Sequence, residues 1–187
     1  MSNTTTSDRP VYSAVTDGSP IQMAIWDGRD FRLSKLLVDS VKEQFEKVVV
    51  DLEDNLPDYA APLRSLNVQV SERTDSISTD GIRIYLNPVW WTTKPHKELR
   101  HCAAFMSRII SDDLIHRRDA VENVNWEIWN IAANLLINRQ LIDQGVGILP
   151  TEGAFITSIK SSMAVEEVYG RLALLSEEEL SKAVWPL

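Results

Sequence analysis

Apolar side chains recur at spacings of three and four over three long stretches of the chain, which is the pattern of amphipathic helices. The first stretch covers residues 31–52 and the last covers residues 126–141. Between them, Pro95 opens a stretch over residues 99–110 that continues towards His116. We name this middle stretch the central helix, and together the three stretches predict a mostly helical protein.

Two short segments alternate apolar and polar residues, as half-buried strands do. They cover residues 66–70 and 82–86, and a polar turn over residues 75–81 separates them. Pro57 and Pro62 interrupt the helical pattern before the first of them. We expect the two strands to pair in a small sheet, so the fold class is α+β with helices in the majority.

The chain beyond the third helix predicts a glycine-containing stop and two short helices. Asp143 is followed by Gln-Gly-Val-Gly and then by Pro150, and these glycines suit a left-handed helix cap. The short helices are expected over residues 162–175 and 176–184. The second one opens with Ser176 followed by three glutamates, which suit a helix N-terminus.

A length of 187 residues favours a single domain. Residues 1–20 are rich in Ser, Thr, Asp and Pro and lack apolar periodicity. We expect them to form an arm that gains order only by docking on this domain or on another protein. Residues 21–187 are expected to form the domain itself.

The composition limits the classes of partner. The chain has 19 basic and 27 acidic side chains and a net charge of -8, which repels nucleic acid and anionic lipid headgroups. Its N-terminus lacks the basic and apolar regions of a signal peptide, and no apolar run reaches about 18 residues. Cys102 is the only cysteine, so no internal disulfide can form, and its place in the central helix predicts a buried small side chain. These features predict a cytoplasmic protein without a nucleic-acid or membrane partner.

Five short motifs follow one another in the second half of the chain. They are Tyr85-Leu86-Asn87-Pro88, Glu98-Leu99-Arg100, Trp129-Asn130-Ile131-Ala132-Ala133, Ile137-Asn138 with Gly145 and Gly147 after it, and Met163-Ala164-Val165-Glu166-Glu167-Val168-Tyr169. In these motifs, residues 82–172 resemble a zincin-like metallopeptidase family of bacteria and phages, often found beside von Willebrand factor A-like domains. The resemblance implies a zincin-like α+β fold with a small sheet packed on the central helix.

The same resemblance implies where a zinc site would lie. The family carries the motif HExxH on the central helix, with two zinc-binding histidines and a glutamate as general base. By position, Phe105, Met106 and Ile109 stand at those three places, and none of them can bind zinc or take a proton from water. Asn134 stands where the family has an aspartate. We therefore predict an inactive domain without catalytic residues, metal or cofactor, in which apolar core fills the former site.

A scaffold kept without its catalytic groups is expected to act by binding. The resemblance makes the expected partner another protein, or a second copy of this chain, and the expected setting a phage-encoded virion component or host-factor modulator. Large aromatic side chains are enriched at binding hot spots, so Trp90, Trp91 and Trp185 are the candidate contact residues. At least one of the adjacent pair Trp90 and Trp91 is expected to be exposed.

Two other functions stay open. In the first, His96, Glu98, His101 and His116 serve as displaced ligands of a metal-dependent hydrolase. Two histidines five residues apart point to different sides of a helix, which favours solvated histidines near helix ends instead. In the second, the acidic surface mimics nucleic acid and blocks a DNA-binding protein.

Overall fold

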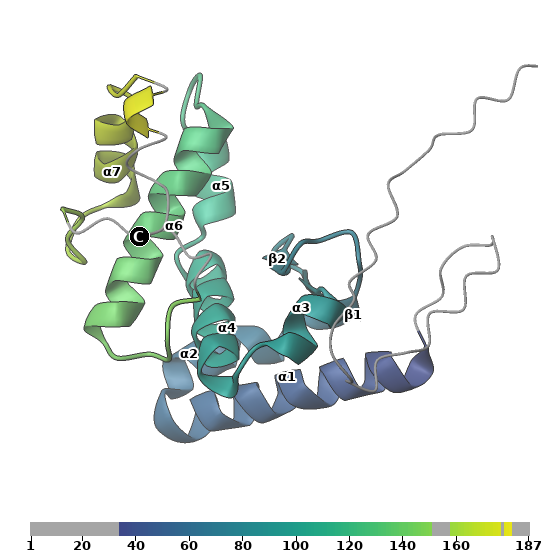
Figure 1. The fold of residues 1–187 in the computed structure, drawn as a ribbon. Helices are drawn as coiled ribbons and strands as arrows, with labels where there is room; N and C mark the ends of the chain where they lie inside the picture. Colours follow the sequence, from purple (N-terminus) through teal and green to yellow (C-terminus); the bar gives the residue numbers. More distant parts are fainter. Residues whose placement is uncertain (1–33, 151–157, 177, 181–187) are drawn as a thin grey trace, which may run out of the picture. The chain divides into compact units, whose positions relative to one another are not determined.

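The computed structural model describes residues 34–150, 158–176 and 178–180 (Figure 1). The arm predicted over residues 1–20, its boundary with the domain, and Trp185 lie outside the described residues. The elements are α1 (Lys35–Asn55), α2 (Pro57–Arg64), β1 (Asn67–Val70), β2 (Ile77–Thr79), β3 (Arg83–Leu86), α3 (Pro88–Thr93), α4 (His96–Ser111), α5 (Leu114–Asp119), α6 (Trp126–Asp143) and α7 (Val165–Leu172). This confirms a mostly helical α+β fold.

Helix α1 realises the first apolar stretch. Ser34 caps its N-terminus by accepting a hydrogen bond from the Leu37 N–H at 3.2 Å. One face of the helix is buried, with the side chains of Val41, Phe45, Val48, Val49 and Leu52. Residues after α1 form a further helix, α2, which the sequence did not predict. Pro57 occupies its first turn, where a missing N–H costs no hydrogen bond.

The sheet has three strands in the order β1-β3-β2. The predicted strands β1 and β3 do pair, in parallel, with Asn67 opposite Arg83. Strand β2 pairs with β3 in antiparallel fashion, with Ile77 opposite Leu86, and it lies in the segment predicted as a turn. That prediction was wrong for residues 77–79. Both β1 and β2 are edge strands among the described residues.

Helix α3 begins where β3 ends, because the Asn87 side chain accepts a hydrogen bond from the Trp90 N–H at 2.9 Å. The helix turns Trp91 into the core, where its side chain is 0% exposed and its ring lies 5.7 Å from that of Phe45. Trp90 is only partly buried. The expectation that one tryptophan of the pair reaches the surface therefore holds for Trp90.

The central helix is α4, and it ends earlier than the sequence indicated. Asp113 adopts a left-handed backbone conformation, with φ of 52°, and separates α4 from α5. Helix α6 follows, capped by Asn125, and ends as predicted at glycines with positive φ. Gly145 has φ of 68° and Gly147 has φ of 69°.

The C-terminal elements are shorter than the sequence predicted. Helix α7 begins only at Val165, so the predicted start at residue 162 was wrong. Ser176 and Glu179 bond each other reciprocally, since the Ser176 N–H donates to the Glu179 carboxylate and the Glu179 N–H donates to the Ser176 hydroxyl. This is the capping box expected of a helix that starts at Ser176. Residues 178–180 are helical, and residues beyond 180 lie outside the described part.

Helix α4 contacts α1, α2, α6 and β2, and so lies at the centre of the described elements. Its buried side chains join one hydrophobic core with those of α1, α6 and α7. This arrangement confirms that a small sheet and several helices pack on the central helix.

Candidate functional site

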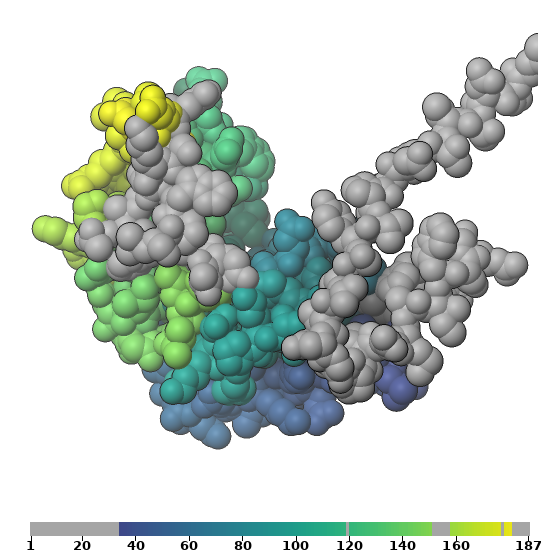
Figure 2. Space-filling view, viewed as in Figure 1, coloured from purple at the N-terminus to yellow at the C-terminus, as the bar shows by residue number. Residues whose placement is uncertain are grey.

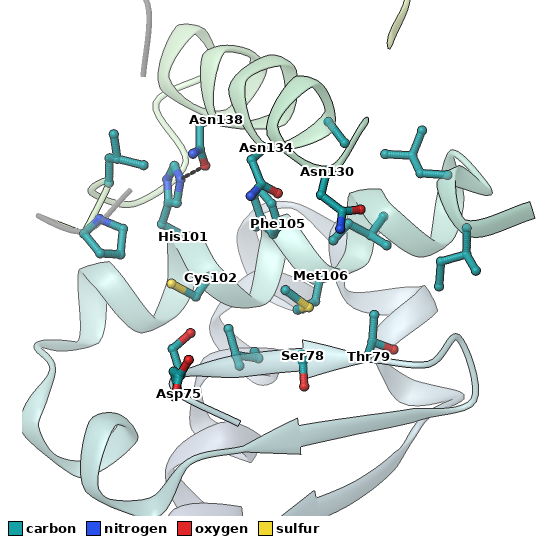
Figure 3. A pocket seen from close by; sticks show the side chains of 18 of the residues that line it. Asp75, Ser78, Thr79, His101, Cys102, Phe105, Met106, Asn130, Asn134 and Asn138 are labelled. Carbon is teal, nitrogen blue, oxygen red and sulfur yellow. Dashed lines mark hydrogen bonds between the residues drawn. The ribbon is translucent and has the colours of Figure 1, made fainter. Parts of the chain in front are cut away.

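A pocket of about 680 Å³ opens between β2, α4 and α6. In the space-filling view of Figure 2, a hollow lies between the blue-teal atoms around β2 and the green atoms of α5. The pocket's polar side chains are drawn from all three elements (Figure 3). Its lining includes Asp75 to Thr79, Trp90, His101, Cys102, Phe105, Met106, Ile109, Leu114, Ile115, Arg118, Trp129, Asn130, Ala133, Asn134, Asn138, Leu149 and Pro150.

Helix α4 contributes two pairs of side chains to this pocket, each with a spacing of four residues. In Figure 3, His101 and Phe105 lie on the side of α4 that faces α6, whereas Cys102 and Met106 lie on the side nearer the strands. Residues four apart share one face of a helix. Among the α4 side chains that line the pocket, His101 therefore supplies the one imidazole, and the others are apolar or contain sulfur.

His101 is held from two directions and is only 2% exposed. Its Nδ1–H donates to the main-chain carbonyl of Val146, with 3.0 Å between the nitrogen and the oxygen. Its Nε2 lies 3.1 Å from Oδ1 of Asn138, on α6. With Nδ1 protonated, Nε2 accepts a hydrogen bond from the Asn138 NH₂ once the oxygen and nitrogen of that amide are exchanged. The two contacts together fix the orientation of the ring.

The turn after α6 supplies the carbonyl that holds His101. Ile148 N–H donates to the Lys97 carbonyl at 3.0 Å, so the turn is joined to α4 by its main chain. Gly147 lies against α4 so closely that a Cβ there would be 2.5 Å from the Lys97 carbonyl oxygen and 2.7 Å from the main-chain nitrogen of His101. Only glycine fits this approach, since Cβ atoms do not come so near to main chain.

Helix α6 lines the pocket with three asparagines at a spacing of four residues. Asn130 is exposed, Asn134 is partly buried and Asn138 is 5% exposed. Asn138 bonds His101, whereas the side chains of Asn130 and Asn134 form no hydrogen bond with any described residue. The amides thus form a polar stripe along an otherwise apolar helix.

The four residues predicted to replace the zinc site do come together. Phe105, Met106 and Ile109 of α4 and Asn134 of α6 all line the pocket. The expectation that they fill this place with core holds for Met106, which is 5% exposed, whereas Phe105 and Ile109 pack against the core but are only partly buried and line the pocket. An open pocket remains where apolar packing was predicted.

The residues considered as displaced metal ligands do not converge. His96 is exposed and lies 3.0 Å from the Asp51 carboxylate, while His116 is exposed beside Asp113. Glu98 pairs with Lys94 at 3.7 Å. Within the described ranges, no group of three or more His, Cys, Asp or Glu side chains could hold a metal ion. The prediction that His101 is solvated was wrong, since it is 2% exposed. The sequence offered His101 only as a displaced metal ligand, and Asn138 was not recognised as a site residue.

The candidate contact tryptophans have separate places. Trp90 lines the pocket, and its ring lies 5.3 Å from the Lys94 ammonium group. Trp91 is completely buried and so cannot touch a partner in this conformation. Trp185 lies outside the described residues. Binding by Trp90 stays a prediction.

Comparison with known families covers most of the chain, since residues 42–184 match a family described as "Putative metallopeptidase domain". The chain belongs to this family. No curated protein and no solved structure matches it. In this metallopeptidase-family domain, no helix of the described residues is long and apolar enough to cross a membrane.

The HExxH motif that the resemblance implies can be placed on α4 in two frames, because residues four apart lie on the same helix face. The frame given above runs from Phe105 to Ile109, and the other runs from His101 to Phe105. The second frame places an oriented imidazole in the pocket at its first position, which no residue of the first frame does. As a hypothesis we therefore favour the second frame, with His101, Cys102 and Phe105 at the motif positions.

Among the described residues, the donor set of the pocket does not fit a catalytic zinc ion. Such a site needs about three protein ligands from His, Cys, Asp or Glu, with a carboxylate near the metal as base. At the positions of the favoured frame the pocket offers His101, the thiol of Cys102, the ring of Phe105 and the neutral amide of Asn134, and the Asp75 carboxylate also belongs to the lining. A phenyl ring has no lone pair for zinc, and an amide is a poor ligand beside a carboxylate.

Proposed function

We propose that this member of the metallopeptidase family has lost zinc-dependent peptidase activity and that its pocket binds a segment of another protein. The observation that carries the proposal is the side-chain set of the pocket. Of the four motif positions, Phe105 has no lone pair for zinc, Asn134 offers only a neutral amide, and Cys102 has a thiol where a glutamate general base would stand. The pocket itself remains open, with a volume of about 680 Å³.

His101 supports the view that the pocket descends from a metal site. Its Nδ1–H donates to a main-chain carbonyl, which is how histidines that bind metals are commonly oriented by their surroundings. Its Nε2, which would face a metal, meets the Asn138 amide at 3.1 Å. The orienting hydrogen bond is thus kept, while the neighbouring ligands are replaced.

The test is zinc titration and peptidase assay of the full chain. The wild-type protein should bind zinc weakly and show no zinc-dependent cleavage of a mixed peptide substrate. The variant Cys102→Glu/Phe105→His/Asn134→Asp should bind zinc at least 100-fold more tightly than the wild type. A matched variant in the other frame, Phe105→His/Met106→Glu/Ile109→His, should gain much less. Zinc-dependent cleavage by the wild type that His101→Ala abolishes would overturn the proposal.

The binding half of the proposal has its own test. Asn134→Arg places a long charged side chain in the pocket, whereas Asn55→Arg places the same side chain at the end of α1. Partner proteins captured from the source cells by the wild type and by Asn55→Arg should be lost with Asn134→Arg. Equal capture by all three proteins would locate binding away from the pocket and contradict the proposal.

A further inference from the structure

The two ends of the pocket carry opposite charges. Among the described residues that line it, Asp75 supplies the carboxylate and Arg118 supplies the guanidinium. Asp75 comes just before β2, and in Figure 3 it lies at the opposite end of this strand from Thr79. Gly81, just after β2, lies beside α5, since a Cβ there would be 3.8 Å from Cδ1 of Ile115. Arg118 belongs to α5, so the positive charge lies at the far end of the strand from Asp75.

The Asp75 carboxylate is the group in this lining that has a charge to neutralise. Asp75 is exposed and forms no hydrogen bond or ion pair with a described residue. Arg118, by contrast, has its guanidinium 3.6 Å from the centre of the Trp126 ring. The net charge of -8 on the chain also favours cations near its surface. A positive group that enters the pocket is therefore attracted to the Asp75 end and repelled from the Arg118 end.

The Asn87 side chain places Trp90 beside the segment that carries Asp75. Its NH₂ donates to the Thr74 carbonyl at 2.7 Å, and its Oδ1 accepts from the Trp90 N–H at 2.9 Å. The Trp90 ring is partly buried and lines the pocket. One asparagine thus holds a large aromatic ring and a carboxylate at the same end of the pocket.

An aromatic ring beside a carboxylate suits a long basic side chain. The methylene stem of Lys or Arg packs on apolar surface, and the charged head pairs with an acid. Lys94 shows this chemistry within the chain, because its ammonium group lies 5.3 Å from the centre of the Trp90 ring and 3.7 Å from the Glu98 carboxylate. In the pocket, the same ring and the Asp75 carboxylate offer a second place of this kind.

We propose that Trp90 and Asp75 form a subsite for one basic side chain, Lys or Arg, of the partner segment that the pocket binds. The stem of this side chain packs on the pocket side of the Trp90 ring, and its head pairs with the Asp75 carboxylate. Arg118 disfavours a second basic residue at the other end, so the charges also fix the direction of the segment. This inference rests on the proposed function, since it assigns specificity to the same pocket.

The experiment selects peptides from a display library of random 12-residue sequences on the full chain. Peptides that no longer bind the variant Asn134→Arg are kept, because they occupy the pocket. We expect the kept peptides to share one Lys or Arg. Replacing this residue with norleucine, which has no charge, should weaken binding about fivefold in fluorescence anisotropy, as the loss of a charge pair does. High salt should remove most of this difference, because it screens exposed charges.

Protein variants separate the carboxylate from the ring. Asp75→Asn should weaken the basic peptide about fivefold and leave the norleucine peptide unchanged. Asp75→Lys should bind a peptide with glutamate at this position more tightly than the wild type does. Trp90→Ala should weaken the basic and the norleucine peptide alike, because both carry the stem. Asp54→Asn, which removes an exposed carboxylate of α1, should change neither dissociation constant. Circular dichroism verifies that each variant is folded.

Two outcomes would overturn the inference and leave the proposed function standing. One is a set of kept peptides without a shared basic residue, and the other is equal affinity of wild type and Asp75→Asn for the basic peptide. In both cases the loss of binding with Asn134→Arg still locates the peptide in the pocket. A library that yields no peptide sensitive to Asn134→Arg would contradict the inference and the proposed function together.

Discussion

Nε2 of His101 lies 3.1 Å from the side-chain amide of Asn138, and both residues are buried. The pair joins the central helix to α6 beneath the pocket. Removing Asn138 leaves the buried Nε2 of His101 without this hydrogen bond, which costs more than a hydrogen bond contributes when both groups are present. This relationship allows a direct comparison of two asparagines on one helix.

Asn138→Ala should lower the free energy of unfolding by about 1–3 kcal/mol, because it leaves the buried Nε2 of His101 without this hydrogen bond. Asn134→Ala should change it by less than about 0.5 kcal/mol, because Asn134 bonds no described residue. Urea denaturation of the two variants provides the measurement. Equal destabilisation would show that His101 does not depend on Asn138.

Gly147→Ala should destabilise the protein by about 2–5 kcal/mol, since a Cβ would collide with the main chain of α4 and the backbone is left-handed. Gly145 supplies the control. Its φ is 68°, similar to the 69° of Gly147, but a Cβ there meets nothing within 4 Å. Gly145→Ala should cost only about 1–2 kcal/mol of backbone strain. Thermal denaturation of both variants would reveal the difference, and similar losses would contradict the close approach.

Trp91→Ala should lower the free energy of unfolding by about 3–5 kcal/mol, because its completely buried ring packs against Phe45. Trp90→Ala should cost clearly less, since Trp90 is partly buried at the pocket rim. Guanidinium titrations followed by circular dichroism would measure both. A larger loss for Trp90 would mean that it is the core residue of the pair.

Asp80 should make stability dependent on acid pH. Hydrogen bonds from the Arg83 N–H and then the Ile82 N–H hold the pKa of its carboxyl below the ordinary value of 3.8. A lowered folded-state pKa means that the carboxylate stabilises the fold above pH 3.8 and that this stabilisation disappears as the pH falls through the folded-state pKa. Asp80→Asn should therefore be less stable than the wild type near pH 7 and approach it near pH 3.

The control for this pH series is Asp54→Asn, which removes an exposed carboxylate that bonds no described residue. Its urea midpoint should differ from that of the wild type by the same small amount at both pH values. If the difference in stability between Asp80→Asn and the wild type were also the same at both pH values, the Asp80 carboxylate would not stabilise the turn between β2 and β3.

Helix α1 could be predicted because it buries one continuous face, and burial imposes the period that the sequence displays. In α4 and α6 the buried residues spread over more of the circumference, yet apolar residues still recur at spacings of three and four. Strand β2 could not, because its residues Ile77, Ser78 and Thr79 include one apolar side chain and the strand depends on pairing with β3. Helix α2 was missed because Pro57 and Pro62 are read as breakers. Pro57 lies in the first turn, where it does no harm.

The pocket shows a different limit of sequence reasoning. The sequence indicated a helix face whose residues Phe105, Met106 and Ile109 do line the pocket, and residues four apart along the helix share such a face. The partners that identify His101 are Asn138 and Val146, which are 37 and 45 residues further along the chain. No local pattern contains such contacts. The burial of His101 was therefore inaccessible until α6 and its following turn were placed beside α4.

The close approach of Gly147 to α4 also bears on how other members of the family can be interpreted. The glycine allows the turn to reach the central helix, and this requirement is the same whether or not the pocket holds a metal. A glycine at this position in another family member indicates that the turn can still contact the central helix, and it says nothing about catalysis. Under the proposed function, activity across the family would instead follow the residues corresponding to Cys102, Phe105 and Asn134, which can change while the turn stays the same.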